Sequence, residues 1–278
     1  MGLVTLKHVL IAAESKSAYA MGLVCQGWED SRAYVEAGAL ADAPVILSAG
    51  PGARRNMPIA LWGQMFQTLA QQSHSPVVAH LDHGQNLTDV QQALDAGFTS
   101  VMFDGSALPI QENIALTQQV IDIAKRYGAS VEAEVGMVGY ENGTPSEGTT
   151  VAEVKTFAAE CPVDALAISV GNLHLQTQGH AKIHWDRLAD IEAVTSIPLV
   201  LHGGSGIKIA DRHRLARQHR VRKMNVGTEF RQRYGQALRK TLANDPAIFD
   251  RTEIMLASVS SMRALAVELL MASWHGDV

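Results

Sequence analysis

The sequence is poor in several kinds of residue, and each shortage excludes a class of protein. Cysteine occurs only twice in 278 residues, at Cys25 and Cys161, and the two form no CxxC pair. No disulfide framework is therefore expected. Lysine and arginine number 23 against 28 acidic residues, and the net charge of −5 provides no basic footprint for nucleic acid or an anionic membrane. These shortages favour a small molecule as the binding partner.

Long apolar runs are also missing. None approaches the roughly 20 residues that a membrane-spanning helix needs, and residues 1–17, MGLVTLKHVLIAAESKS, are typical of a short amphipathic helix rather than of a signal peptide. We therefore expect a cytoplasmic protein without a membrane partner. Apolar residues, in contrast, make up 47% of the chain, and there are 11 histidines. The chain can bury a large core, and histidine would carry any metal ion.

Short apolar runs rich in Val and Ile alternate with longer segments of helical periodicity. Segments 86–97 and 110–128 have apolar residues at every third or fourth position and end in glycine, as helices commonly do. The apolar runs lie at 18–24, 43–48, 75–81, 99–104, 130–136, 164–171, 197–204 and 221–227. Eight strand–helix units predict a closed (β/α)₈ TIM barrel of parallel strands rather than an open sheet. We expect one domain over residues 1–278, with an additional C-terminal helical segment at 246–274.

Polar side chains stand where the predicted strands end, which is where active sites of this fold lie. They are Asp82 and His83 after the third run, Asp104 after the fourth, Glu132 and Glu134 in the fifth, His174 after the sixth, His202 at the end of the seventh and Asn225 in the eighth. All should converge on one mouth of the barrel. Three histidines from three strand ends can hold a first-row divalent ion and leave positions open for substrate. The favoured ion is Zn²⁺, ahead of Mn²⁺, Fe²⁺ or Co²⁺.

The remaining histidines have simpler explanations. His180 and His184 are four residues apart but lie in a stretch, QGHAKIHWD, that is typical of a loop, so we expect them at the surface. His213 and His219 belong to DRHRLARQHR, a basic helix face that we expect to be solvated. A lone histidine such as His83 is more often structural than a ligand, so the metal hypothesis depends on the combination.

The stretch LHGGSGI, residues 201–207, has the composition of a phosphate-binding turn. Gly203, Gly204 and Ser205 allow backbone N–H groups to approach a ligand, and a helix N-terminus is expected at Ile207. On the eighth strand, NVGTEF would supply Asn225, Gly227 and Thr228 to the same anion. Most glycine-rich turns are only tight turns, but the position of this one beside His202 favours phosphate binding.

Five motifs, HLDHG, VEAEVG, ISVGNLH, LVLHGGSGI and KMNVGTEFR, resemble in order and spacing the class II, metal-dependent ketose-bisphosphate aldolases. The resemblance covers nearly the whole chain. It implies a (β/α)₈ barrel with one Zn²⁺ held by His83, His174 and His202. It makes Asp82 the acid/base at the hydroxyl that is formed or lost when a carbon–carbon bond is cleaved. It also places the carboxylates of Asp104 and Glu134 near the metal, where they can serve an alternative ion position.

The same resemblance implies the remaining parts of the site. The groups that it places around the phosphate of dihydroxyacetone phosphate and a monovalent cation, Na⁺ or K⁺, are Gly171, Gly203, Gly204, Ser205, Asn225 and Thr228. Glu141 is the nearest match to a proton-transferring acid in the loop after the fifth strand. The implied activity is cleavage or formation of the C3–C4 bond of a ketose phosphate or bisphosphate by a homodimer or homotetramer.

Several positions depart from the family pattern. Val24, Cys25 and Gln26 stand where the first strand normally ends in a Phe-Asn pair, Leu175 replaces a glycine, and Gly227 replaces a side chain. Alternatives therefore remain open. They are a metal aldolase with a non-phosphorylated donor, a Schiff-base aldolase that uses Lys223, a metal-dependent hydrolase and a non-catalytic aldolase-like subunit.

Overall fold

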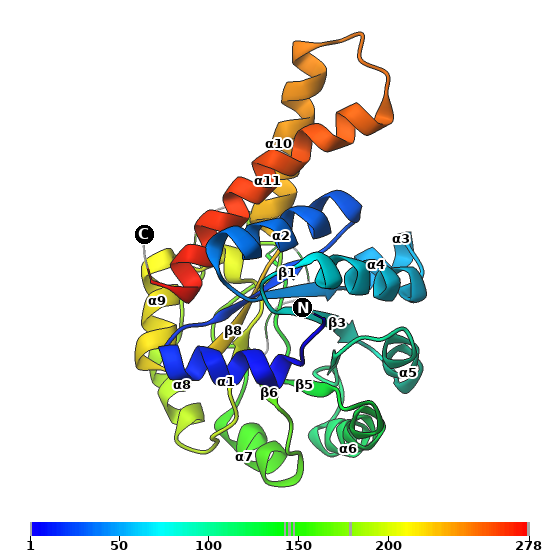
Figure 1. Cartoon of the computed structure of the whole chain (residues 1–278). Coiled ribbons are helices and arrows are strands. Elements are labelled where there is room, and N and C mark those ends of the chain that lie inside the picture. The colour runs from blue at the N-terminus through cyan, green and yellow to red at the C-terminus, as the bar shows by residue number, and fades with distance from the viewer. Residues whose placement is uncertain (1, 142, 144–145, 147, 178–179, 277–278) are drawn as a thin grey trace.

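The computed structural model describes residues 2–141, 143, 146, 148–177 and 180–276. Eight parallel strands pair in chain order and close into a barrel, with β1 hydrogen-bonded to β8 (Figure 1). The strands are β1 (Ala20–Val24), β2 (Val45–Ala49), β3 (Val77–Gly84), β4 (Ser100–Phe103), β5 (Ser130–Val135), β6 (Ala165–Ile168), β7 (Leu199–Leu201) and β8 (Val221–Val226). The predicted (β/α)₈ TIM barrel is confirmed.

Eleven α-helices in the described part of the chain surround this barrel or extend from it (Figure 1). They are α1 (Leu6–Lys16), α2 (Trp28–Ala41), α3 (Pro51–Asn56), α4 (Ile59–Gln72), α5 (Leu87–Asp95), α6 (Ile110–Tyr127), α7 (Val151–Glu160), α8 (Trp185–Glu192), α9 (Ile209–Gln218), α10 (Thr228–Asn244) and α11 (Arg251–Trp274). A 3₁₀ turn, η1 (Gly204–Gly206), precedes α9. Helix α9 thus begins at Ile209, two residues after the expected Ile207.

Local signals in the sequence explain where the helices begin and end. The side chain of Asn86 accepts a hydrogen bond from the Asp89 N–H at 2.9 Å and caps α5. Helix α6 ends at Gly128, which adopts the left-handed conformation with φ of 64°. Both helices match the predicted segments to within two residues.

Strand β3 is longer than predicted. It continues to Gly84, where it still pairs with Phe103 of β4, although the register shifts between Leu81 and Gly84. Asp82 and His83 are therefore strand residues at the barrel mouth rather than loop residues. Polar side chains end the apolar pattern there, but they do not end the backbone pairing.

The C-terminal segment forms a long helix that packs along the barrel. Helix α11 begins at Arg251, because the Asp250 side chain accepts from the N–H of Thr252 at 2.7 Å and of Glu253 at 3.3 Å. The distal parts of α10 and α11 project together away from the barrel (Figure 1). The predicted segment, 246–274, therefore contains a loop of five residues before the helix.

Helix α11 is also apolar, with a mean hydropathy of 1.6 over 18 residues. Its length and composition alone would allow it to span a membrane. The uninterrupted apolar runs considered in the sequence did not predict this. Such a length and composition are weak evidence of a membrane span, because the core helix of a protein in water can have both. Val259, Met262, Leu265 and Leu269 are buried in the hydrophobic cluster of the barrel, and 39% of the apolar window of α11 is buried.

The basic helix α9 is only partly solvated. Arg214 and Arg217 are exposed, as predicted, whereas Arg212 is buried and donates to the carboxylate of Glu229. His219, just after the helix, lies 2.9 Å from the carboxylate of Glu192. The expected solvated face is therefore wrong for these two residues, because acidic partners from other elements neutralise them.

Two helical glycines give a matched test of this packing. A Cβ on Gly63 of α4 would lie 2.1 Å from the backbone oxygen of Ala96, whereas one on Gly235 of α10 would meet nothing closer than the flexible Arg239 guanidinium at 3.4 Å. We expect Gly63→Ala to lower the free energy of unfolding by about 1–3 kcal/mol. Gly235→Ala should raise it by about 0.5–1 kcal/mol. Urea denaturation measures both, and equal effects would contradict the packing.

Candidate functional site

Three histidines meet at the carboxyl end of the barrel. His83 comes from β3, His202 follows β7, and His174 lies in the loop after β6. The Nε2 atom of His83 lies 2.9 Å from Nδ1 of His202, and one ring nitrogen of each of the three lies within 4.8 Å of the others. Three nitrogens that face one common point can coordinate one small cation.

The backbone of His83 is held in an uncommon conformation. Its φ is 50°, in the left-handed region that residues with a side chain rarely adopt. Arg54 of α3 stabilises this turn by donating to the carbonyls of Asp82 at 2.7 Å and of His83 at 2.9 Å. Sequence reasoning missed Arg54, although its position directly after β2 places it at the same end of the barrel.

Two carboxylates complete a second set of cation ligands. The Asp104 carboxylate lies 2.6 Å from Nδ1 of His83, and Glu134 lies 3.8 Å from the same nitrogen. The Oε2 atom of Glu134 is buried and has no hydrogen-bond partner among the described residues. A buried oxygen without a partner is costly unless a cation satisfies it. The geometry therefore brings together the five residues predicted to surround a metal, and the donor set fits a divalent ion.

The charges at this site depend strongly on burial and on each other. Burial alone would lower the pKa of His83, but Asp82, Asp104 and Glu134 outweigh it and raise that pKa to about 10. Burial lowers the pKa of His174 to about 4, helped by His83. Burial, with Asp104 next in importance, raises the pKa of Glu134 to about 8. Without a metal, the cluster stores a proton that a bound cation would displace.

Glu132 lies deeper in the barrel than the mouth. Its carboxylate is fully buried, 3.1 Å from Nε2 of His202 and 2.8 Å from the ammonium of Lys223. The expectation that it converges on the mouth with Glu134 is wrong, because two residues along a strand of about 3.3 Å per residue separate the two layers. The interaction with Glu132 leaves Nδ1 of His202 facing the other histidines. Lys223 is itself buried and paired, which disfavours a Schiff-base role.

Asp82 is a buried carboxylate beside the three histidines. Burial alone would raise its pKa, but His83, His202 and Lys223 together lower it. Its Oδ1 atom accepts a hydrogen bond from the side-chain amide of Asn225 at 3.0 Å. Asp82 is therefore ionised at neutral pH and oriented from β8, as a proton acceptor must be.

A cavity of about 540 Å³ opens above the cluster. Asp82, His83 and His174 line it together with most of the predicted phosphate groups, which are Gly203, Ser205, Asn225, Gly227 and Thr228. Helix α10 begins at Thr228, so its positive N-terminal end lies at the same cavity. This side of the mouth can bind an anion.

The other two predicted glycines are outside that lining. Gly171 has a φ of 102°, and a Cβ there would lie 2.1 Å from the backbone oxygen of Lys182. A Cβ on Gly204 would lie 2.9 Å from the backbone oxygen of Asn225. Close packing of backbone therefore explains both glycines without a ligand.

The loop after β5 places Tyr140, rather than Glu141, at the cavity. The Tyr140 ring stacks on His174 with the ring centres 5.0 Å apart and lines the cavity. The Glu141 carboxylate accepts from the N–H of Thr177 at 2.7 Å and from its hydroxyl at 2.9 Å. Residues 142, 144, 145 and 147 of this loop lie outside the described residues. Sequence reasoning missed Tyr140, whose aromatic ring beside Glu141 was the available signal.

Two further histidines lie away from the cluster. His180 and His184 are both exposed, as predicted. They therefore serve as reference positions for experiments on His174, which lies in the same loop.

Comparison with known proteins identifies the family. The family model described as "Fructose-bisphosphate aldolase class-II" matches residues 4–274. The chain belongs to the class II fructose-bisphosphate aldolase family. It is 36% identical over 264 residues to fructose-bisphosphate aldolase from Staphylococcus aureus, with 90% of each chain covered. Its identity to the enzyme of that name from Geobacillus stearothermophilus is 35% over 281 residues, with 96% of this chain and 95% of the relative covered.

Solved structures agree with this family assignment. The YdjI aldolase from Escherichia coli K12 superposes with a TM-score of 0.85 and 26% identity, and 98% of each chain is covered. The chain is therefore an aldolase, a carbon–carbon lyase, and class II aldolases depend on a metal ion. The family also implies a sugar phosphate as substrate.

Removal of one histidine tests the cluster as a metal site. We expect His174→Ala to weaken Zn²⁺ binding by about 100-fold or more, because a nitrogen ligand is lost. His184→Ala, an exposed histidine of the same loop, should bind Zn²⁺ as the unchanged chain does. Competition with a chelating dye measures both affinities. Equal affinities in the two variants would exclude His174 as a ligand.

The raised pKa of His83 predicts a pH dependence of metal binding. Zn²⁺ must displace the proton that His83 holds below about pH 10, so raising the pH should strengthen binding. We expect a rise of about tenfold per pH unit between about pH 6 and 8. Asp104→Asn removes the negative charge that helps to raise this pKa, so the affinity should level off at a lower pH. Zinc titrations at fixed ionic strength test this, and an affinity independent of pH would refute it.

Proposed function

We propose that this aldolase uses Zn²⁺, held by His83, His174 and His202, to cleave the C3–C4 bond of a ketose phosphate or bisphosphate. The products are dihydroxyacetone phosphate and an aldehyde. The observation that carries the proposal is the cluster of three imidazole nitrogens within 4.8 Å of one another, beside the buried Asp82. Asp104 and Glu134 would serve an alternative position of the ion.

The breaking bond leaves negative charge on the donor half of the substrate. A bound divalent ion supplies Lewis-acid stabilisation for that charge. The chain supplies the orientation of the site: Arg54 fixes the turn at His83, and Glu132 fixes the ring of His202. Both supports come from the protein itself, so the site's orientation does not depend on the substrate.

Asp82 takes the proton from the C4 hydroxyl during cleavage and returns it during synthesis. Its lowered pKa keeps it ionised, and the amide of Asn225 orients one oxygen while the other side of the carboxylate faces the cavity. Glu141 is the proposed acid for the carbon proton of the donor. This role requires the Glu141 carboxylate to break its hydrogen bond with the N–H of Thr177.

The donor phosphate would bind where η1 and the start of α10 face the cavity. Gly203, Ser205, Asn225, Gly227 and Thr228 line this region, and Gly171 and Gly204 shape the backbone behind it. A monovalent cation, Na⁺ or K⁺, would bind beside the donor phosphate. The proposal includes a cytoplasmic homodimer or homotetramer, whose mass light scattering would give.

Asp82→Asn tests the proton transfer. We expect it to lower kcat for retro-aldol cleavage by about 100- to 10,000-fold, because the amide cannot accept the hydroxyl proton. Bound zinc should be unchanged, since the histidines remain. Asp186→Asn, an exposed carboxylate on α8, is the control and should keep full activity. The assay couples release of dihydroxyacetone phosphate from ketose 1-phosphates and 1,6-bisphosphates to its reduction. Full activity of Asp82→Asn would exclude the assigned role, and activity that survives chelation would exclude the metal.

A further inference from the structure

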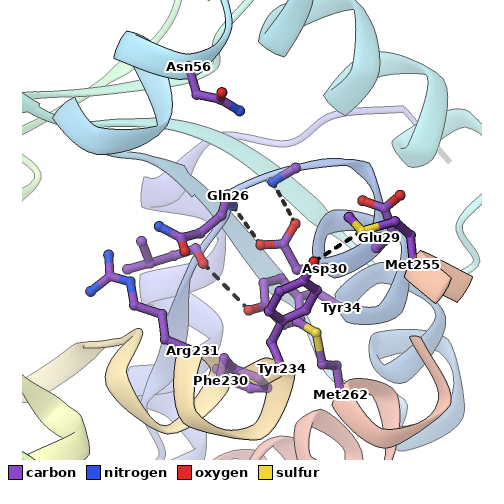
Figure 2. A pocket seen from close by; sticks show the side chains of 12 residues that line it. Gln26, Glu29, Asp30, Tyr34, Asn56, Phe230, Arg231, Tyr234, Met255 and Met262 are labelled. Carbon is purple, nitrogen blue, oxygen red and sulfur yellow. Dashed lines mark hydrogen bonds between the residues drawn. The ribbon is translucent and has the colours of Figure 1, made fainter. Parts of the chain in front are cut away.

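A second cavity, of about 240 Å³, lies between α2, α10 and α11 beside the mouth of the barrel (Figure 2). Val24, Gln26 and Arg231 line both cavities, so the two are adjacent and share a wall. The smaller cavity is below the roughly 300–1,000 Å³ that a whole small ligand usually occupies. It therefore suits one end of a molecule whose reacting part lies at the histidine cluster.

In the proposed reaction, the positions of the phosphate and of the C4 hydroxyl orient the substrate so that its aldehyde half points toward this cavity. The proposed phosphate groups follow β7 and β8, whereas Asp82, which faces the C4 hydroxyl, ends β3. Atoms beyond C4 must therefore continue past Asp82, away from Ser205. On that side the mouth is lined by Gly50, Gly52 and Arg55 after β2 and by Gln26 after β1. Gln26 also leads into the smaller cavity.

The walls of the smaller cavity are mainly apolar. They comprise Val24, Tyr34, Phe230, Tyr234, Met255 and Met262, and Figure 2 shows Asn56 and Arg231 at the periphery. The Tyr34 and Phe230 rings meet edge to face, with centres 4.7 Å apart, and both residues are buried. The Tyr34 hydroxyl donates to the backbone oxygen of Val24, and the Tyr234 hydroxyl to the sulfur of Met255. Both tyrosine hydroxyls therefore have partners within the protein, and Tyr234 is the tyrosine with surface left to meet a ligand.

The charged groups of this cavity do not form a phosphate site. Asp30 accepts three backbone N–H bonds, from Gln26, Gly27 and Ser31, at 2.6–2.9 Å, and burial raises its pKa to about 6. Glu29 adds a second carboxylate, and Arg231 is the one cation among the lining residues. A terminal phosphate would place a dianion against apolar walls and two acidic side chains, which is costly.

We propose that this cavity is the subsite for the far end of the aldehyde half, and that it accepts an uncharged, largely apolar chain rather than a second phosphate. The inference rests on the proposed aldolase reaction, because that reaction defines which half of the substrate lies beyond Asp82. Apolar contact with Val24, Tyr234 and Met255, which are partly exposed at the cavity, supplies the selectivity.

Aldol addition tests the subsite directly. With dihydroxyacetone phosphate as donor and zinc-loaded protein, kcat/KM is measured for straight-chain aldehydes from propanal to hexanal and for glyceraldehyde 3-phosphate. We expect kcat/KM to rise about fourfold for each methylene that enters the cavity. Hexanal should exceed both propanal and glyceraldehyde 3-phosphate by about tenfold or more.

A pair of neighbouring substitutions on α11 supplies the control. Met255→Lys introduces a charge at the cavity wall and should lower the hexanal-to-propanal ratio of kcat/KM about tenfold. Leu256→Lys makes the same change on an exposed residue of the same helix, outside the cavity lining, and should leave the ratio unchanged. Equal ratios in the two variants would overturn the assignment.

Deuterium exchange into dihydroxyacetone phosphate, without aldehyde, separates the subsite from the reaction on which it rests. If exchange occurs but the rate of addition does not depend on aldehyde chain length, or addition prefers glyceraldehyde 3-phosphate, the subsite is overturned and the proposed function stands. If neither exchange nor addition occurs, both the subsite and the proposed function are overturned. A changed oligomeric state in Met255→Lys, with no chain-length effect in the unchanged protein, assigns the cavity to a second copy of the chain and overturns the subsite.

Discussion

The buried pair of Lys223 and Glu132 is the constraint on which the site depends. Both side chains are fully buried inside the barrel, where an unpaired charge would cost several kcal/mol. Their contact, with a nitrogen–oxygen distance of 2.8 Å, joins β5 and β8 across the core of the barrel. It also fixes what lies above it, because the same Glu132 carboxylate meets His202. Nε2 of His202 thus contacts Glu132, and its Nδ1 faces His83.

The layer above is held by contacts from outside the barrel. Arg54, on α3, donates to three backbone oxygens, including those of Asp82 and His83, and so supports a left-handed residue within a strand. A conformation of this kind costs about 1–3 kcal/mol and persists only where the surroundings enforce it. The turn separates the directions of two adjacent side chains: Asp82 meets Asn225 and His83 meets Asp104. One dipeptide thereby supplies a proton acceptor and a candidate metal ligand to the same cavity.

The sequence predicted the parts of this arrangement that follow from periodicity. Alternating strands and helices indicated the barrel, and the position of His83, His174 and His202 at strand ends indicated one shared mouth. Depth within the barrel was not accessible, because Glu132 and Glu134 have the same strand parity and differ only in layer. Contacts between distant elements could not be predicted from the sequence either. Arg212 lies in a basic segment that is typical of a solvated surface, and only the structure shows that it pairs with Glu229. Tyr140 and Arg54 belong to short loop and helix segments whose direction no repeating pattern encodes.

The two sides of the mouth are built differently, and this difference has a consequence for specificity. The side proposed to bind phosphate consists of backbone turns at strand ends, where Gly203 cannot gain a side chain, because a Cβ would lie 2.0 Å from the backbone oxygen of Leu173. The smaller cavity is formed largely by side chains of α2, α10 and α11, which pack outside the barrel. Side chains such as Met255 can change there without disturbing a strand or the histidine cluster. In the proposed reaction, the barrel would therefore fix the chemistry of the donor half, and the outer helices would determine which aldehyde half fits.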